Sequence, residues 1–418
     1  MGQDIRVVVV GGGYAGVTAA NRLTRRADVA VTLVNPRPMF VERIRLHQLV
    51  GGSDDAVVEY GDVLAPSVRL VVDTATRIDA PRRRVELAGG DGIDYDYLIY
   101  AAGSSRVEPA IPGAAQFGLP IAELADAERL RDALIDAGPA APVCVVGAGP
   151  AGIETASELA EQRRAVTLLC AGELGPSLHP RGRRTVARAL AALGVTVVDG
   201  EGSRVTAVHA DAVELADGRT VPSAVTVWAA GFGVPQLARE SGLTTDALGR
   251  LRTDETLTSV DDDRIVAAGD SAAPSGVPLR MSCQAAGPLG GHAADTVLHR
   301  IGGEQPTPFA MGFVGLCLSL GRRRGIFQFE HKDDTATRMH VSGRAGAAVK
   351  AVVCWGTVES LTIEAKHPGA TRLPAGFTDK ERRRKLAQTA TAAGAAAPAP
   401  AAAAAAVGTA TATRGEHR

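Results

Sequence analysis

Two glycine-rich segments of the sequence have the spacing of loops that hold phosphate groups. Residues 7–16 read VVVVGGGYAG, and residues 143–152 read VCVVGAGPAG. In Gly-x-Gly-x-x-Gly, the first glycine permits a tight turn, the second lets the main chain approach a pyrophosphate, and the third lets a helix pack against a strand. The start of that helix presents free N–H groups and a positive dipole end to the phosphates. One such loop is weak evidence among 48 glycines in 418 residues, but two need a common cause.

The segments that contain these loops repeat each other. Residues 7–35 read as a strand, the glycine loop, a helix (VTAANRL) and a second strand (VTLVN). Residues 143–170 follow the same order, with the helix IETASELAEQ and the strand VTLLC. Continuous valine runs are typical of parallel strands buried on both faces. Each passage is therefore predicted to be a βαβ unit rather than an isolated tight turn.

The repeat continues downstream of both units. Residues 85–105 (VELAGGDGIDYDYLIYAAGSS) parallel residues 213–232 (VELADGRTVPSAVTVWAAGF). Each contains a hairpin with a Gly/Asp turn and an apolar strand that ends in Ala-Ala-Gly. The chain is therefore expected to contain two similar folds and to hold two dinucleotides.

Two such folds, with a late strand that ends in Gly-Asp (DDRIVAAGDSA, residues 262–272), resemble the two-dinucleotide flavoprotein superfamily. It includes pyridine nucleotide-disulfide oxidoreductases, type II NADH dehydrogenases and apoptosis-inducing-factor-like proteins. The resemblance implies an α/β protein with two Rossmann-like domains, the second inserted in the first, and a small α+β C-terminal region. The expected parts are an FAD-binding domain (1–115 and 255–304), an NAD(P)H-binding domain (116–254), a flavin-covering or interface region (305–386) and a disordered Ala/Pro/Thr-rich tail (387–418).

The resemblance also implies an FAD site. Asp270 would hydrogen-bond the ribityl chain, and Gly269 would let the main chain approach it. Asn35 stands where the family usually has an Asp or Glu that binds the adenosine ribose. Its amide can accept a hydrogen bond from one ribose hydroxyl but cannot form the pair of charge-assisted hydrogen bonds that a carboxylate forms. Arg37 either covers the adenine or pyrophosphate or is a solvated loop residue. The expected FAD-binding residues are Gly11, Gly13, Tyr14, Ala15, Gly16, Asn35, Arg37, Arg43, Ala102, Gly103, Gly269 and Asp270.

The second loop would hold NADH or NADPH. Glu154 resembles the glutamate that type II NADH dehydrogenases place near the nicotinamide, although a glutamate at a helix start is also favoured by the dipole. The ribose-sensing position is Cys170, so the choice depends on whether Glu173 or an arginine of HPRGRR reaches the ribose; NADH is slightly favoured. The expected binding residues are Gly147, Gly149, Pro150, Gly152, Ala230 and Gly231.

The acceptor side is expected near His47 and Gln284. His47, in FVERIRLHQ, could protonate reduced quinone or flavin because histidine titrates near neutrality, or it belongs to the polar face of a surface helix. Cys283-Gln284 resembles the Ala-Gln-x-x-Gln helix start that lines the quinone site of type II NADH dehydrogenases. Gly287 stands at the position of the second glutamine, so the sequence does not decide whether the electron acceptor is a quinone. Gln284 alternatively contacts the flavin through its main chain.

Several other chemistries are not supported. A formal net charge of −1 gives no field for nucleic acid. The five cysteines are scattered and never form Cys-x-x-Cys, so a redox-active disulfide, sulfide oxidation and a zinc site are not expected. No unbroken apolar run reaches the length of a membrane span. A cytoplasmic protein is expected, with peripheral contact at the inner face of the cell membrane and a homodimer both left open. The cluster KERRRK (380–385) either touches anionic lipid or is a solvated helix end.

The C-terminal region is predicted to contain strands after residue 306 and an apolar helix over 345–361 that contains Lys350. Together these features favour an FAD-dependent NAD(P)H oxidoreductase that passes hydride to FAD and electrons to a quinone or another small acceptor. One alternative is a ferredoxin or rubredoxin reductase, with residues 322–324 as the basic docking patch. Another is a redox-sensing binding protein similar to apoptosis-inducing factor.

Overall fold

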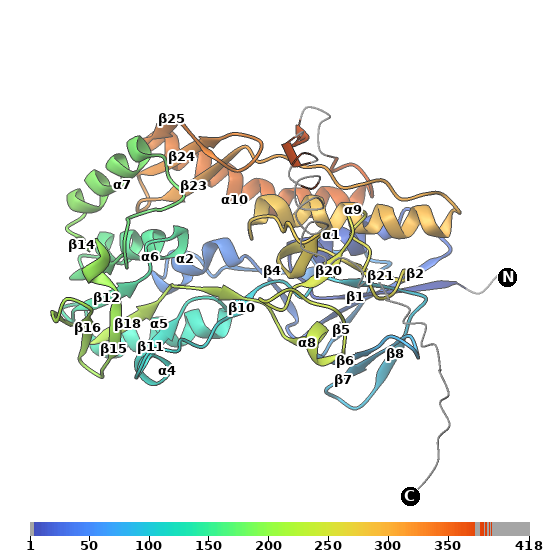
Figure 1. Ribbon diagram of the computed structural model, residues 1–418, viewed down its shortest axis with the longest axis horizontal. Helices are drawn as coiled ribbons and strands as arrows, with labels where there is room; N and C mark the ends of the chain where they lie inside the picture. The colour runs from blue at the N-terminus through green and yellow to red at the C-terminus, as the bar shows by residue number, and fades with distance from the viewer. Residues whose placement is uncertain (1–3, 373–376, 380, 383, 385, 387–418) are drawn as a thin grey trace, which may run out of the picture.

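The molecule is elongated, with two lobes each built around a sheet and a C-terminal region that lies along both (Figure 1). The computed structural model describes residues 4–372, 377–379, 381, 382, 384 and 386. The tail over 387–418 lies outside the described residues, as does part of the basic cluster 380–385.

The first sheet is parallel and has the order β21-β9-β1-β2-β5. Its strands are β1 (Ile5–Val10), β2 (Val29–Asn35), β5 (Arg69–Val72), β9 (Tyr97–Tyr100) and β21 (Ile265–Ala267). The valines of β1 from residue 7 to residue 10 are buried because strands flank them and helices cover them. The helices α1 (Tyr14–Leu23) and α9 (Cys283–Ile301) pack against each other beside this sheet.

The second sheet is also parallel, with the order β11-β18-β12-β13-β14. Its strands are β11 (Gly118–Pro120), β12 (Val143–Val146), β13 (Val166–Leu169), β14 (Thr196–Val198) and β18 (Val225–Trp228). Its helices are α5 (Leu124–Ala137), α6 (Pro150–Glu161) and α7 (Pro180–Ala192). In the amino-acid sequence, all strands and helices of the second sheet come after β9 and before β21 of the first sheet. This order confirms two Rossmann-like units with the second inserted in the first.

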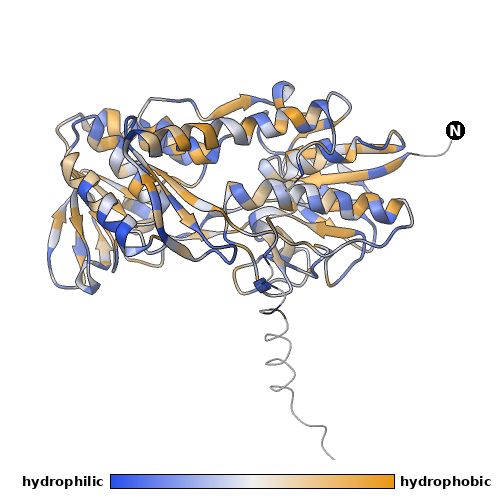
Figure 2. Ribbon diagram, turned by 90° about the horizontal axis from the view of Figure 1, so that it is seen from above, coloured by the Kyte–Doolittle hydropathy of each residue, from blue (hydrophilic) through white to orange (hydrophobic). Residues whose placement is uncertain are grey.

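Antiparallel pieces complete both units. The chain passes between the lobes through β10 (Ser105–Arg106) and β19 (Phe232–Gly233), which pair with each other. The predicted hairpins are present, as β6 (Ala75–Asp79), β7 (Arg84–Leu87) and β8 (Gly92–Asp94), and as β15 (Val205–Val208), β16 (Ala212–Leu215) and β17 (Thr220–Pro222). Figure 2 shows hydrophobic residues concentrated in the strands of the two lobes.

Short elements fill the connections. The strands are β3 (Met39–Val41), β4 (Val57–Glu59), β20 (Leu251–Thr253) and β22 (Ala272–Pro274). The helices are α2 (Leu46–Val50), α3 (Tyr60–Val63), α4 (Ala114–Phe117) and α8 (Leu237–Glu240), with 3₁₀ turns at η1 (Arg43–Arg45), η2 (Glu201–Ser203) and η3 (Gly269–Ser271).

The C-terminal region joins the two lobes. It consists of an antiparallel sheet, β23 (Gly315–Ser319), β24 (Gly325–Glu330) and β25 (Ala336–Ser342), followed by α10 (Gly343–Lys366), which is longer than the predicted helix. By length and composition α10 could cross a membrane. It nevertheless packs on α1, β23 and β24, and its Lys350 and Glu364 are buried in ion pairs. These contacts make it part of the folded body.

Candidate active site

Two cavities lie where the predicted loops meet the rest of the fold. The larger has a volume of about 840 Å³ and is bounded by α1, α6, α9, β23 and α10. The smaller, of about 290 Å³, lies in the first lobe at the carboxyl ends of β1, β2 and β9. Ligands of parallel α/β sheets bind at this edge of the strands.

The first glycine loop has the geometry of a phosphate cradle. Gly11 has a φ of +108°, and a Cβ there would lie 2.2 Å from the carbonyl oxygen of Ala101. A Cβ on Gly16 would lie 1.8 Å from the carbonyl oxygen of Gly11. By contrast, a Cβ on Gly13 would have no protein atom within 4 Å. Gly11 and Gly16 thus serve the turn and the packing, and the open space at Gly13 fits a phosphate group.

The second loop repeats this arrangement. Gly147 has a φ of +114°, and its Cβ would lie 2.9 Å from the main chain of Ala229. A Cβ on Gly152 would lie 1.8 Å from the carbonyl oxygen of Gly147, whereas Gly149 again faces open space. Gly149 also lines the large cavity. In both loops the second glycine therefore leaves free space at the N-terminus of a helix, which is where the pyrophosphate of a dinucleotide binds.

The small cavity has the groups expected around an adenosine. The Asn35 Oδ1 accepts the Gly12 N–H at 3.0 Å, and the Nδ2 donates to the Arg37 carbonyl at 2.8 Å. Arg37 pairs with Glu123 at 3.1 Å, and the Tyr60 hydroxyl donates to the Gly12 carbonyl at 2.8 Å. The Asn35 side chain thus shapes the loop on which the cofactor would lie.

Arg43 and Asp270 lie where the two cavities approach each other. Arg43 lines both cavities and donates to the carbonyls of Ser104 and Ala122 at 2.6 and 2.7 Å. The Ser104 hydroxyl donates to Asp270 at 2.7 Å, which holds that carboxylate at the wall of the large cavity. One extended ligand could therefore run from the adenosine end past Asp270.

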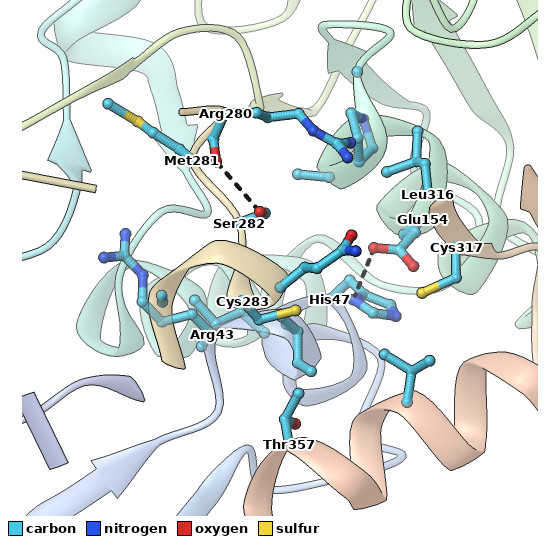
Figure 3. A pocket seen from close by; sticks show the side chains of 18 of the residues that line it. Arg43, His47, Glu154, Arg280, Met281, Ser282, Cys283, Leu316, Cys317 and Thr357 are labelled. Atoms are coloured by element: carbon cyan, nitrogen blue, oxygen red, sulfur yellow. Dashed lines mark hydrogen bonds and ion pairs between the residues drawn. The ribbon is translucent and has the colours of Figure 1, made fainter. Parts of the chain in front are cut away.

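The wall of the large cavity contains a buried cluster of polar side chains. The Lys350 Nζ lies 2.9 Å from the Glu154 Oε1, and the Ser319 main-chain N–H donates to the same oxygen at 2.8 Å. The Ser319 hydroxyl lies 3.0 Å from the His47 Nε2. Figure 3 shows His47 and Glu154 side by side, with the Cys317 thiol next to them and Thr357 across the cavity on α10. Residues from four parts of the chain thus form one charged site.

The charges in this cluster stabilise each other. Burial acts to raise the pKa of the Glu154 carboxyl, but the Lys350 ammonium and the Ser319 N–H outweigh it and lower that pKa below its ordinary value. Burial acts to lower the pKa of Lys350, but Glu154 raises it above its ordinary range. The site therefore keeps a carboxylate and an ammonium across the neutral pH range.

His47 does not titrate near neutrality as expected. It is 4% exposed, and burial lowers its pKa to about 4, while Lys350 adds to that effect. The imidazole is therefore neutral at pH 7, because its pKa lies below the neutral range in which it was expected to titrate. A role of His47 in protonating quinone or flavin stays a prediction. The positive charge at this wall is carried by Lys350.

The same shift predicts a pH-dependent stability. Because folded His47 binds a proton less readily than the unfolded chain, its stabilisation is complete above about pH 6.5 and is lost as the pH falls toward about 4. Between pH 7 and about pH 4.5 the free energy of unfolding should fall by roughly 2 to 3 kcal/mol more in the wild type than in His47→Gln. Urea unfolding at both pH values measures this difference, and equal losses in the two proteins would contradict it.

Gln284 lies in the cavity wall, but both ends of its amide form hydrogen bonds with the main chain. In the orientation that satisfies both ends of its amide, it donates to the Gly315 carbonyl at 3.0 Å and accepts from the Val314 N–H at 2.9 Å. Gln284 therefore ties the start of α9 to the segment that enters β23. This contact favours a structural role over direct binding of an acceptor.

The structure brings most of the predicted residues to the two cavities. The small cavity is lined by Gly11, Gly13, Asn35, Arg37, Arg43, Ala102 and Gly103. The large cavity is lined by Tyr14, Arg43, His47, Gly149, Pro150, Glu154, Asp270 and Gln284. The remaining predicted residues, which support these walls or turns without lining them, are Ala15, Gly16, Gly147, Gly152, Ala230, Gly231 and Gly269. Their roles with bound nucleotides stay predictions.

Sequence reasoning missed Lys350, Ser319 and Arg280. Lys350 was visible as a single charge in the apolar run over residues 345–358, which is the signal of a buried, paired lysine. Arg280 lines the cavity, pairs with Glu330 at 2.8 Å and stacks over Phe313. Ser319 carries no signal in the sequence because its contacts depend on the long-range fold.

The cysteines remain separate thiols. All five are free in the structure, and Cys283 and Cys317 line the large cavity. Burial raises the pKa of Cys317 to about 12, which keeps it a protonated thiol. Among the described residues there is no cluster of His, Cys, Asp and Glu that could hold a metal ion.

Residues 5–289 match the pyridine nucleotide-disulphide oxidoreductase family, and the chain belongs to that family. Its relatives place it in the type II NADH dehydrogenase-like branch, so it is an oxidoreductase enzyme. Both statements confirm the resemblance seen in the sequence.

Among individual proteins, the chain is 32% identical to the NADH dehydrogenase-like protein Rv1812c of Mycobacterium tuberculosis, over 77% of this chain and 87% of that protein. It is 26% identical to the demethylphylloquinone reductase NdbB of Synechocystis, over 76% and 84% of the two chains. Its fold is similar to that of NDH2 from Plasmodium falciparum in complex with NADH, with a TM-score of 0.72, 15% identity and coverage of 89% and 100%.

Proposed function

We propose that this protein is an FAD-dependent NADH:quinone oxidoreductase that works without a redox-active disulfide. The observation that carries the proposal is the large cavity, where the second glycine loop, Asp270 and the Glu154–Lys350 pair line one continuous wall. The names of the relatives support NADH as the electron donor and a quinone as the electron acceptor. The overall reaction takes NADH, one proton and a quinone to NAD⁺ and a quinol.

The residues around the two cavities fit FAD. The open space at Gly13 would receive the pyrophosphate, Asn35 would accept a ribose hydroxyl, and Asp270 would hydrogen-bond the ribityl chain. When bound, FAD supplies a ring that takes hydride from a nicotinamide and releases electrons to an acceptor. The protein positions the three partners and excludes water.

NADH would bind along the second loop. The open space at Gly149 would receive its pyrophosphate, and Glu154, one turn further along α6, would face the nicotinamide end. Glu173 and Arg183 form an ion pair near the ribose-sensing Cys170, so neither is free to select a ribose by charge alone. We keep NADH as the preferred donor because the relatives that are named type II NADH:quinone oxidoreductases carry NADH in their names.

Lys350 supplies the electrostatic part of the reaction. Its ammonium lies in the cavity wall, where water is excluded and charge interactions are strong. It would stabilise negative charge that develops on the acceptor oxygen as electrons arrive. Glu154 holds the ammonium in place and keeps it protonated.

Peripheral membrane contact is part of the proposal. Val352 and Trp355 on α10 are 63% and 62% exposed, which gives this helix an apolar outer face near the cavity. A lipid-soluble quinone would reach the cavity most directly from a bilayer surface, as at the inner face of the cell membrane. Flotation with lipid vesicles tests this part.

A ferredoxin reductase is the second candidate. Arg323 and Arg324 are exposed at the turn between β23 and β24, but Arg322 is paired with Glu158 at 2.8 Å. Steady NADH oxidation with menadione supports the quinone reductase. Oxidation only when ferredoxin is added would support the second candidate, and a reduced flavin that lasts without turnover would indicate a redox sensor.

Glu154→Gln should lower turnover with NADH and menadione by roughly 10- to 100-fold, since it removes the carboxylate that holds Lys350. It should also destabilise the protein by about 3 kcal/mol because a buried ammonium loses its counter-charge. Steady-state kinetics and urea unfolding measure the two effects.

The matched control is Glu158→Gln, one turn further along α6 and outside both cavities. It should keep wild-type turnover. Glu154→Gln combined with Lys350→Gln should recover stability but not turnover. Full activity in the double variant would show that the pair is only structural.

A further inference from the structure

Residues 275–282, which connect β22 to α9, form one edge of the large cavity. Three of them line it and lie together along that edge in Figure 3, namely Arg280, Met281 and Ser282. Within the described part of the chain, no main-chain N–H of residues 279–281 donates to a main-chain carbonyl. The position of this segment therefore depends on side-chain contacts, which come from two arginines.

The first arginine comes from the C-terminal end of the described chain and holds the base of the segment. Arg382 donates to both carboxylate oxygens of Glu255 at 2.8 and 2.9 Å. It also donates to the carbonyls of Val277 and Pro274, at 2.9 and 3.4 Å. Although it belongs to the basic cluster 380–385, Arg382 is only 5% exposed, so it is not available to solvent or to lipid. Bidentate arginine–carboxylate pairs are strong, and this one clamps the turn at the base.

The second arginine holds the tip of the segment less completely. The Arg280 guanidinium lies 2.8 Å from the Glu330 carboxyl and 2.9 Å from the Asp334 Oδ1, and it stacks over the Phe313 ring. The Arg280 Nε and the Asp334 Oδ1 are nevertheless buried without a hydrogen bond. Asp334 also has a φ of +72°, which a side chain rarely adopts. A buried polar cluster that is only partly satisfied adds little stability, so this contact is the one that opens.

The charges at the tip are also out of balance. The Glu330 side chain is 2% exposed, and burial raises its pKa to about 7 although Arg280 acts to lower it. Asp334 raises that pKa further, and Asp333 adds negative charge beside Asp334. When Glu330 is ionised, one guanidinium therefore faces two buried carboxylates. Removing the charge of Glu330 should strengthen the tip contact.

We propose that residues 275–282 form a lid on the large cavity, which opens at the Arg280 contact and is clamped at its base by Arg382. Opening moves residues 280–282 away from the cavity and gives a ligand a way in, and closing excludes water. The clamp keeps this motion local because it fixes the turn at residues 274–277. The C-terminal segment thereby controls access to a site whose walls lie elsewhere in the chain. This inference holds for whichever ligands the cavity takes and does not rest on the proposed function.

Trypsin measures the opening, because it cleaves after Arg280 only when the lid leaves the folded body. Arg382→Gln removes the base clamp and should make this cleavage about tenfold faster than in the wild type. Glu330→Gln can still bond to Arg280 but carries no charge, so at about pH 8.5 it should make the cleavage roughly threefold slower. Mass spectrometry of the new chain end at Met281 identifies the site.

Cys283 measures whether the same motion admits a molecule. Its thiol lines the large cavity directly after the lid. In Arg382→Gln its alkylation by N-ethylmaleimide should be faster by a factor similar to that for trypsin, in preparations with equal flavin content. Cys144 is fully buried in the second sheet and lines neither cavity. It should stay unmodified, which shows that the protein as a whole remains folded.

Arg84→Gln is the matched control. Arg84 pairs with Asp94 at 2.7 Å on the hairpin of the first lobe and lines neither cavity. This variant loses the same charge and should leave both rates at the wild-type values.

Three outcomes would overturn the inference. Unchanged cleavage and alkylation in Arg382→Gln would show that this arginine clamps nothing that moves. Faster cleavage without faster alkylation would show a mobile loop that does not control access. If Arg382→Gln unfolds and Cys144 is modified, Glu330→Gln decides alone, and cleavage at the wild-type rate or faster in that variant would contradict the lid.

Discussion

Gly13→Val should give a folded protein that lacks flavin. Gly13 has a φ of −84° and a ψ of −169°, which any residue adopts, and its Cβ would meet no protein atom within 4 Å. The substitution therefore leaves the protein's own packing undisturbed. The valine side chain would occupy the space proposed for the FAD pyrophosphate, and close main-chain approach would be lost. We expect flavin content to fall below about a tenth of the wild-type value.

The flavin absorbance per chain after purification, together with the thermal unfolding midpoint, measures both parts of this result. Gly61→Val is the matched control, because that glycine also faces open space but lies outside both cavities. It should keep its flavin. Gly16→Val should instead prevent folding, since its Cβ would lie 1.8 Å from the Gly11 carbonyl oxygen. A fully flavinated Gly13→Val protein would refute the first site.

Gly149→Val should prevent binding of NADH while FAD stays bound. Its main chain has a φ of −76° and a ψ of −178°, and its Cβ also faces open space. The variant should fold and keep its flavin, because the first loop is untouched. NADH should reduce that flavin at least about a hundredfold more slowly, since the pyrophosphate of NADH is displaced.

Dithionite provides the control for Gly149→Val, because it reduces flavin without binding at the second loop. The flavin of this variant should bleach with dithionite at the wild-type rate. Anaerobic stopped-flow absorbance with each reductant gives both rates. Reduction by NADH at the wild-type rate would mean that the second loop does not hold the nicotinamide nucleotide.

The fold was predictable because its main signals are local and occur twice. The valine runs, the two loops and the hairpins ending in Ala-Ala-Gly each fix a short element, and their repetition fixes the pairing of domains. The open positions at Gly13 and Gly149 follow from the same spacing. The assignments of individual residues to FAD or NADH stay predictions, as do the domain boundaries.

The site was less predictable because it depends on contacts between distant segments. The imidazole of His47 is neutral because Ser319 and α10 bury it. The residues near position 47 in the sequence give no indication of that burial. Lys350 lies almost two hundred residues from Glu154, so its role appears only when the C-terminal helix packs over the cavity. Gln284 lines the large cavity, but its amide is used by the main chain, which depends on the segment that enters β23.

The central claim is that two phosphate-binding loops on one chain bring a flavin and a nicotinamide together in the large cavity. Anaerobic mixing of the purified protein with NADH, followed by menadione, tests it most directly through the flavin absorbance. We predict a yellow protein whose flavin is bleached by NADH and restored by menadione. A protein that binds no FAD, or whose flavin does not respond to NADH, would contradict the account.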